Sequence, residues 1–254
     1  MLGYRIISYL IPLISSLLIS LLFFKEDLVF LLYILLFIFV FLGTMFFIMD
    51  KVKDKKKTFY FSLFSLLISY SVLTLFLFLE NFYFKLGLVL TNLVLLFIFF
   101  NELFIIYFKN IIKESERLWL YIKQAKLFLI FFVTSIFFGF RDFFNLSPYL
   151  TLVIFFIMMF ILSWYHNWQS WSLKISAFNY RLIMSLVMAQ VFWGLTILPQ
   201  VYFFKGIIFT IFYFIFDELI IWHFSKRYQV KYIKNIIAIS LLLLLLLFIT
   251  AQWF

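Results

Sequence analysis

Residues 28–49 read LVFLLYILLFIFVFLGTMFFIM, a stretch of 22 residues that contains no charged side chain. At a rise of about 1.5 Å per residue, a helix of this length crosses a bilayer core of about 30 Å. Apolar residues occupy consecutive positions here instead of alternating, which argues against a membrane-spanning strand. The stretch therefore predicts a transmembrane helix.

The rest of the chain has the same character, since 67% of its 254 residues are hydrophobic and 25% are aromatic. Soluble domains of this length contain far fewer such residues. Further apolar runs predict an all-α protein, a polytopic transmembrane helix bundle of about nine spans. The expected helices are Ile6–Phe24, Leu28–Met49, Phe59–Leu79, Leu86–Phe108, Leu118–Phe140, Pro148–Tyr165, Arg181–Leu198, Ile207–Phe224 and Ile236–Phe254.

The polar connections between these runs are short. The longest are DKVKDKKK at 50–57 and KNIIKESER at 109–117, and neither is long enough to fold alone. We therefore expect one integral membrane domain over residues 1–254. Its expected parts are a first helix hairpin at 1–49, a possible two-helix insertion at 50–117 and a five-helix bundle at 118–254.

Basic residues are distributed unevenly between the two sides of the expected bundle. If the N-terminus lies inside, only Lys25, Lys85, Arg141 and Lys205 lie outside, and the other 17 of the 21 Lys and Arg residues lie inside. This asymmetry follows the positive-inside rule, so we expect the N-terminus inside and the C-terminus outside. The net charge of +10 is then explained by topology and anionic lipid, and nothing supports a nucleic-acid partner.

Amino-acid usage bears on the source and on bound metals. Phe, Leu, Ile, Lys and Tyr dominate, as in proteins encoded by A/T-rich genomes, so we expect the mitochondrial inner membrane or, alternatively, a bacterial cytoplasmic membrane. The chain has no cysteine, and its two histidines, His166 and His223, are far apart. These observations exclude disulfides and cysteine-ligated metal and predict neither a haem nor a zinc site.

Ionisable residues inside apolar runs are the first candidates for function, because they are costly in hydrocarbon. Glu102 lies in FFNELFIIYFK, and Asp217 and Glu218 lie in IFDELIIWHFSKR. These carboxylates predict either a proton relay or a cation site. The alternative is that they are polar groups whose hydrogen bonds are made by a neighbouring helix or subunit. Asp142, beside Arg141 at an expected outer helix end, predicts instead an ion pair between these two neighbours at the headgroups.

The two acidic runs also suggest an internal repeat. FNEL at 100–103 and FDEL at 216–219 are about 116 residues apart, which would relate the first four helices to the next four. A tandem four-helix repeat of this kind favours a proton- or cation-coupled transporter whose acidic helices line a path.

A second group of candidates lies at the expected inner membrane surface. LSWYHNWQSWSLK at 162–174 places Trp164, His166, Trp168 and Trp171 there, and His223 lies near Lys226 and Arg227. Tryptophans and histidines are typical anchors at a membrane interface, so contacts to lipid or to another subunit are expected.

The run that begins at Arg181, RLIMSLVMAQ, resembles the helix of ATP synthase subunit a that faces its c-ring. That family typically reads R-L-x-x-N-x-x-x-G followed by an acidic residue or histidine. Here Ser185, Ala189 and Gln190 occupy these positions. The resemblance implies a proton-channel subunit in which Arg181 faces a partner ring.

A longer run, PYLTLVIFFIMMFILSWYHN from Pro148, resembles the fourth helix of cytochrome c oxidase subunit III. In that family a Pro-x-x-Asn-Thr start leads to a Thr-Trp-x-His-His exit. Ser163, Trp164 and His166 match the exit in spacing, and Asn167 replaces the second histidine. Further segments resemble neighbouring helices of the family in the same order, namely those at 131–140, 191–204 and 244–254.

The chain also departs from that family. Ile136 stands where the family's third helix has a buried glutamate, and Asp217 and Glu218 stand where its sixth helix has histidine and glycine. The two helices within 50–117 have no counterpart.

The resemblance to subunit III implies a membrane-embedded subunit of a respiratory-chain complex that has no redox centre and no catalytic centre of its own. Such a subunit stabilises the catalytic core of an oxidoreductase complex and supports proton uptake by its neighbour. It binds no cofactor directly but holds phospholipid. Its expected partners are other membrane subunits and lipids.

Overall fold

The computed structural model describes residues 2–49, 55–109, 115–163, 177–225 and 230–250. Every regular element within these ranges is helical, which confirms the predicted all-α class. In the described residues the helices form nine rods. They are α1 (Leu2–Ser20), a continuous second rod made of α2 (Val29–Leu36), a π-helical segment (Phe37–Leu42) and α3 (Gly43–Met49), α4 (Lys55–Phe78), α5 (Phe82–Lys109), α6 (Ser115–Phe144), α7 (Pro148–Leu162), α8 (Ala177–Thr196), α9 (Tyr202–Ser225) and α10 (Val230–Thr250).

Five stretches of the described residues are long and apolar enough to cross a membrane. They are Gly3–Phe23, Val29–Met49, Lys57–Phe78, Phe82–Phe108 and Leu120–Phe144. The apolar parts of α7 and α10, Pro148–Leu162 and Lys234–Leu247, are shorter than the about 20 residues that a spanning helix needs. The helices therefore indicate an integral membrane protein with five candidate spans in the described residues, where the sequence predicts nine, and α8 and α9 are not among the five.

The connection between α6 and α7 shows why these helices end and begin where they do. Asn145, the residue after α6, has a φ of 48°, a left-handed conformation that ends a helix and that asparagine tolerates better than most residues. Ser147 is the N-cap of α7, and its Oγ accepts a hydrogen bond of 3.3 Å from the Leu150 amide. Pro148 follows at the first helical position, where its missing N–H costs nothing.

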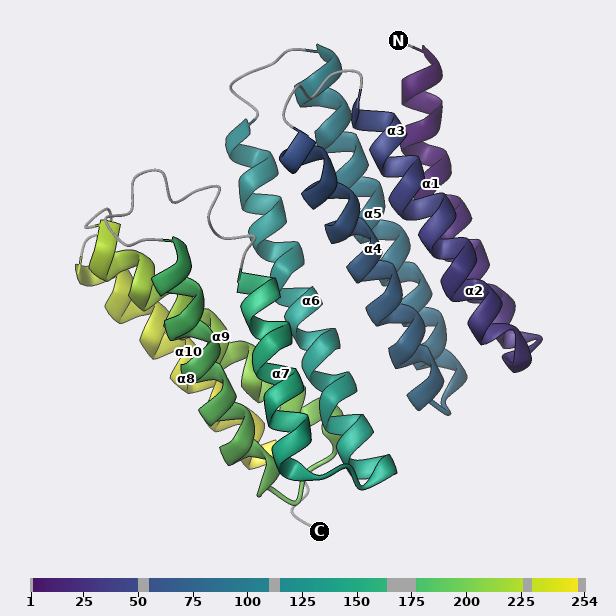
Figure 1. The fold of residues 1–254 in the computed structure, drawn as a ribbon. Helices are drawn as coiled ribbons and strands as arrows, with labels where there is room; N and C mark the ends of the chain where they lie inside the picture. Colours follow the sequence, from purple (N-terminus) through teal and green to yellow (C-terminus); the bar gives the residue numbers. More distant parts are fainter. Residues whose placement is uncertain (1, 50–54, 110–114, 164–176, 226–229, 251–254) are drawn as a thin grey trace. The chain divides into compact units, whose positions relative to one another are not determined.

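The chain divides into two compact units, Met1–Leu129 and Ile130–Phe254. Unit 1 contains four whole rods and the part of α6 up to Leu129, and the four whole rods form a closed ring. In it α1 packs on α5, α5 on α4, α4 on the second rod, and the second rod on α1 (Figure 1). The interior of this ring is apolar, with fully buried side chains such as Phe64, Ile68, Leu96 and Phe99, but it also contains several buried serines.

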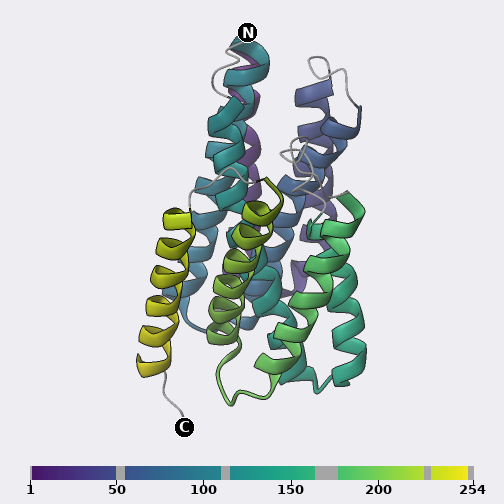
Figure 2. The same cartoon turned by 90° about the vertical axis from the view of Figure 1, so that its left-hand side faces the viewer.

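Unit 2 arranges its last four helices in a row. α7 packs on α8, α8 on α9 and α9 on α10, and Figure 2 shows them in this order from green to yellow. Four phenylalanines, from α6, α7, α8 and α9, form the core. The Phe155 and Phe192 rings stack at 4.1 Å, Phe138 stacks on Phe192 at 4.5 Å, and Phe209 meets Phe155 edge-on at 5.3 Å. This aromatic core fixes α8 and α9 next to each other.

Candidate functional site

A buried group of polar side chains lies between α8 and α9. The Tyr180 hydroxyl, near the start of α8, donates a hydrogen bond to Oδ1 of Asp217 on α9. Tyr213 lies four residues before Asp217, and therefore on the same face of α9. We call Tyr180, Tyr213 and Asp217 the tyrosine–aspartate cluster, and each of its side chains is at most 2% exposed.

The position of the cluster follows from the pattern of α9. Lys205, Phe209, Tyr213 and Asp217 recur every four residues, and all of them are buried. They form the face of α9 that packs against the aromatic core. A carboxylate at the end of this face must find a hydrogen-bond donor, because burying an unpaired charge costs several kcal/mol or more. Tyr180 supplies that donor, and hydrogen bonds to charged groups contribute about 1.5–3 kcal/mol.

Glu218, next to Asp217, is equally buried, at 2% exposed. Adjacent residues on a helix point about 100° apart, so the two carboxyl groups face different neighbours of α9. The structure thus brings both predicted acids of this run into the interior of unit 2. Such groups can take up or release a proton where the charge is poorly screened.

The other predicted residues of unit 2 that the structure describes are less buried than these two acids. Arg181 follows Tyr180 and is half-buried, while its backbone carbonyl accepts a 2.5 Å hydrogen bond from the Ser185 hydroxyl. His223 lies in the last turn of α9 and is exposed, in contrast to Asp217. The predicted interface residues Trp164, His166, Trp168 and Trp171 lie outside the described residues.

Glu102, the remaining predicted acid, is on α5 in unit 1 and is half-buried. It belongs to a different unit from Asp217 and Glu218. Within the described ranges, no three side chains of histidine, cysteine, aspartate or glutamate come together as a metal site would require.

An ion pair in unit 2 differs from the one predicted for Asp142. Asp142 at the end of α6 pairs with Lys205 on α9, with 3.2 Å between Oδ2 and Nζ. The prediction had paired Asp142 with its neighbour Arg141. The Lys205 side chain is only 5% exposed and Asp142 is 35% exposed. Loss of the ion pair would therefore leave a buried, uncompensated charge on the lysine. Sequence alone could not show this contact, because 63 residues separate the two.

Unit 1 contains a polar cluster that the sequence reasoning missed. The Nδ2 group of Asn92 on α5 lies 2.7 Å from Ser15 Oγ and 3.1 Å from Ser16 Oγ, both on α1. Ser15 Oγ lies 3.4 Å from Ser69 Oγ on α4. The signal in the sequence was Asn92 itself, an amide in the middle of the apolar run LGLVLTNLVLLFIFF. We call these four residues the Asn92 cluster.

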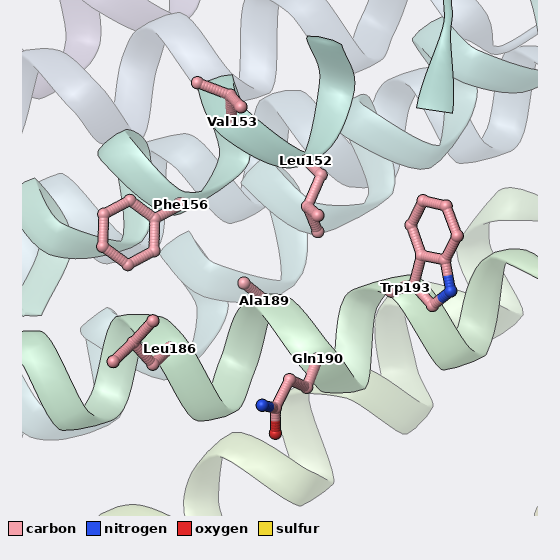
Figure 3. A pocket seen from close by; sticks show the side chains of 7 residues that line it. All are labelled: Leu152, Val153, Phe156, Leu186, Ala189, Gln190 and Trp193. Carbon is pink, nitrogen blue, oxygen red and sulfur yellow. The ribbon is translucent and has the colours of Figure 1, made fainter. Parts of the chain in front are cut away.

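An open cavity of about 480 Å³ lies between α7 and α8. Figure 3 shows its lining, in which the Gln190 amide and the Trp193 indole nitrogen are the polar groups among the labelled side chains. The others are Leu152, Val153, Phe156, Leu186 and Ala189. Gln190 is one of the residues in the run that resembles ATP synthase subunit a, and here it is exposed, with its side chain directed away from the α7 residues of the cavity.

Comparison with known proteins identifies no relative: no family model, no curated protein and no solved structure matches this chain.

Proposed function

We propose that this protein is a proton- or cation-coupled membrane transporter in which Asp217 is the exchanging group. The observation that carries the proposal is a carboxylate buried in unit 2 and hydrogen-bonded to a buried tyrosine of the neighbouring helix α8. Ionisable residues inside membrane helices face a bundle interior or a cavity and mark proton or ion paths. The tyrosine–aspartate cluster has this character.

The side chains suggest how a proton would be held. With Asp217 ionised, the Tyr180 hydroxyl donates to Oδ1 and stabilises the negative charge. When Asp217 takes up a proton, its carboxyl group becomes neutral and the hydrogen bond from Tyr180 weakens. The contact between α8 and α9 therefore changes with the charge on Asp217. Glu218, on a second face of the same helix, is the next group that could receive the proton.

Proton flux into proteoliposomes tests this proposal. A potassium gradient with valinomycin drives proton uptake, and an internal pH dye reports it. Asp217→Asn should reduce the flux at least tenfold, and Glu218→Gln should reduce it as well. Glu80→Gln is the matched control, because Glu80 is an exposed carboxylate outside the helices and its loss should leave the flux unchanged. Equal flux in all three variants would rule the proposal out.

A second candidate function is that of a respiratory-complex subunit resembling oxidase subunit III. Both ends of α7 favour it. The helix starts at Pro148, which Ser147 caps, and a fully buried Ser163 follows its last residue. These are the two ends of the segment that resembles the fourth helix of subunit III. Ile136 is 8% exposed, so the position that holds a glutamate in that family is buried here but apolar. This departure favours a stabilising role over a direct role in proton transfer.

Co-purification distinguishes the two candidates. The native protein, extracted in mild detergent, should comigrate with haem-containing membrane subunits and phospholipid if it belongs to an oxidase. A chain that migrates alone and has no haem absorption would exclude the subunit function. Enrichment in a mitochondrial inner-membrane fraction or a bacterial cytoplasmic-membrane fraction would at the same time give the compartment.

We propose in addition nine spans with the N-terminus inside, based on the distribution of basic residues. Because the chain contains no cysteine, single cysteines can be introduced without removing native ones. Lys25→Cys and Lys55→Cys are both at exposed positions, on opposite expected sides of the membrane. An impermeant maleimide should label residue 25 from outside and residue 55 only after permeabilisation. The reverse pattern would contradict this topology.

A further inference from the structure

Two buried nitrogen donors are unsatisfied at one end of unit 2. Asp142 pairs with Lys205 and not with its neighbour Arg141. The Nη1 group of Arg141 is buried and makes no hydrogen bond to any residue that the structure describes, and the same holds for the Nε2 group of Gln200. Gln200 is only 8% exposed. Buried donors in folded proteins almost always have an acceptor, so these two groups indicate a ligand that supplies oxygens.

Arg141 is held near the start of α9 by the contacts of the two residues that follow it. Asp142 Oδ2 lies 3.2 Å from Lys205 Nζ, and the ring centroids of Phe143 and Tyr202 are 5.7 Å apart. Tyr202 is the first residue of α9, and Lys205 lies in the first turn of the helix. The last turn of α6 therefore contacts the first turn of α9.

The start of α9 adds further attraction for negative charge. The N-terminus of a 24-residue helix carries a partial positive charge and favours anions. Gln200, with its unsatisfied donor, lies two residues before this helix begins. Lys205 Nζ has three donors, and its contacts of 3.2 and 3.4 Å to the Asp142 carboxylate leave at least one of them for a ligand.

We propose that Arg141, Gln200 and Lys205 bind one phosphate-type oxyanion, with the phosphodiester of a lipid headgroup as the best match. We call these three residues the Arg141 site. A guanidinium group binds two oxygens of a phosphate through a pair of parallel N–H groups. The amide of Gln200 and the ammonium group of Lys205 supply the further donors.

The charge at this end of unit 2 matches a singly charged anion. Residues 130–160 and 190–215 contain three charged side chains, the positive Arg141 and Lys205 and the negative Asp142. One positive charge is therefore left without a partner among them. A phosphodiester carries one negative charge and would neutralise it, which removes the cost of a poorly solvated cation.

Exposed apolar side chains favour a lipid over a free anion. Phe144, Ile197 and Val201, which are close to the Arg141 site in the chain, are 63%, 76% and 64% exposed. Exposed apolar side chains that gather in this way are typical of contact with a membrane or another protein. In the proposed topology this end of unit 2 lies at the outer membrane surface, where headgroup phosphates and acyl chains are both within reach.

Binding can be measured on the full-length protein in maltoside, washed until it holds no phosphorus. Thermal unfolding at constant ionic strength is compared in dihexanoyl phosphatidylglycerol, in dihexanoylglycerol, which has the same tails without the phosphate, and in inorganic phosphate. At a concentration about ten times the Kd, the phospholipid should raise the Tm by about 3–6 °C, and dihexanoylglycerol should leave it unchanged. A rise with the phospholipid alone identifies a lipid ligand, and an equal rise with inorganic phosphate identifies a free anion.

Two variants and one control make the test specific. Arg141→Gln should weaken binding at least tenfold, and Gln200→Leu about three- to tenfold. Without ligand, Gln200→Leu should keep or raise the Tm, because it removes a buried donor that has no acceptor, whereas a merely structural role of this side chain would lower the Tm. Lys25→Gln is the matched control, because Lys25 is an exposed basic residue of unit 1 on the same expected side, and it should keep the full response.

The proposal is overturned if the phospholipid and dihexanoylglycerol give the same Tm in the unaltered protein and inorganic phosphate has no effect. It is also overturned if both variants, folded as judged by their helical circular dichroism, keep the half-saturation of the unaltered protein. If Arg141→Gln does not fold, Gln200→Leu alone decides the outcome. The inference does not depend on proton exchange at Asp217, so a loss of proton flux in Asp217→Asn with an intact phospholipid response would separate the two proposals.

Discussion

Replacing Gly206 with alanine tests the packing of α6 against α9. A Cβ at residue 206 would overlap Ser135 Oγ and lie 3.2 Å from Ser135 Cβ and 3.4 Å from its Cα. Overpacking of this kind typically costs about 1–3 kcal/mol, because Ser135 Oγ has to leave its position and Ser135 Cβ has to shift slightly. Alanine also gains about 0.5–1 kcal/mol over glycine within a helix. A control that measures this gain is therefore needed.

Gly87→Ala supplies the control, since Gly87 is exposed within α5 and a Cβ there would have no neighbour within 4 Å. We expect Gly87→Ala to stabilise the protein and Gly206→Ala to be about 1–3 kcal/mol less stable than this control. Thermal unfolding of the detergent-solubilised protein, followed by circular dichroism, gives both values. Equal stability of the two variants would refute the proposed contact.

Ser135→Ala completes a double-mutant cycle. The Ser135 hydroxyl is buried and forms no hydrogen bond with the described residues, so its loss alone should be neutral or slightly stabilising, by up to about 1 kcal/mol. Combined with Gly206→Ala, it removes the overlapping oxygen and should recover most of the lost stability. A double variant no more stable than Gly206→Ala would show that the strain arises elsewhere.

Three further substitutions follow from contacts in unit 2, with thermal unfolding as the common assay. Tyr180→Phe should lower the free energy of unfolding by about 1.5–3 kcal/mol, because Asp217 loses the hydrogen bond from this hydroxyl. The control Tyr149→Phe, at a side chain that is 75% exposed, should change the free energy of unfolding little. Asp142→Asn should destabilise by about 1–3 kcal/mol, and adding Lys205→Met should restore stability, since the buried cation is then gone. Ser147→Ala should cost about 0.5–2 kcal/mol through the lost cap of α7, and no change would show that the cap contributes nothing.

Helices were predictable from the sequence because hydrocarbon allows few alternatives. Residues 28–49 were predicted as one helix, and the second rod covers Val29–Met49. The start of α7 at Pro148 was also predicted correctly, since proline marks a helix beginning. α6 extends from Ser115 to Phe144, beyond the predicted Leu118–Phe140. Hydropathy marks the apolar part of a helix, whereas backbone hydrogen bonding continues into the polar ends.

The sites were less predictable than the helices. Asp217 and Glu218 could be singled out because acids are rare in apolar runs. Tyr180, the donor to Asp217, could not be, because tyrosines are common in this chain and the contact joins residues 37 apart. The serines of the Asn92 cluster were missed for a related reason. A serine in a membrane helix commonly bonds to its own backbone, so its sequence gives no sign of a partner on another helix.

The three-residue turn at Asn145–Ser147 has a consequence for how the protein is made. α7 has 15 residues, about 22 Å of helix, which is shorter than an independent span needs. Under the proposed nine-span topology, the short turn ties α7 to the longer apolar helix α6, and we therefore expect the two helices to insert together as a hairpin.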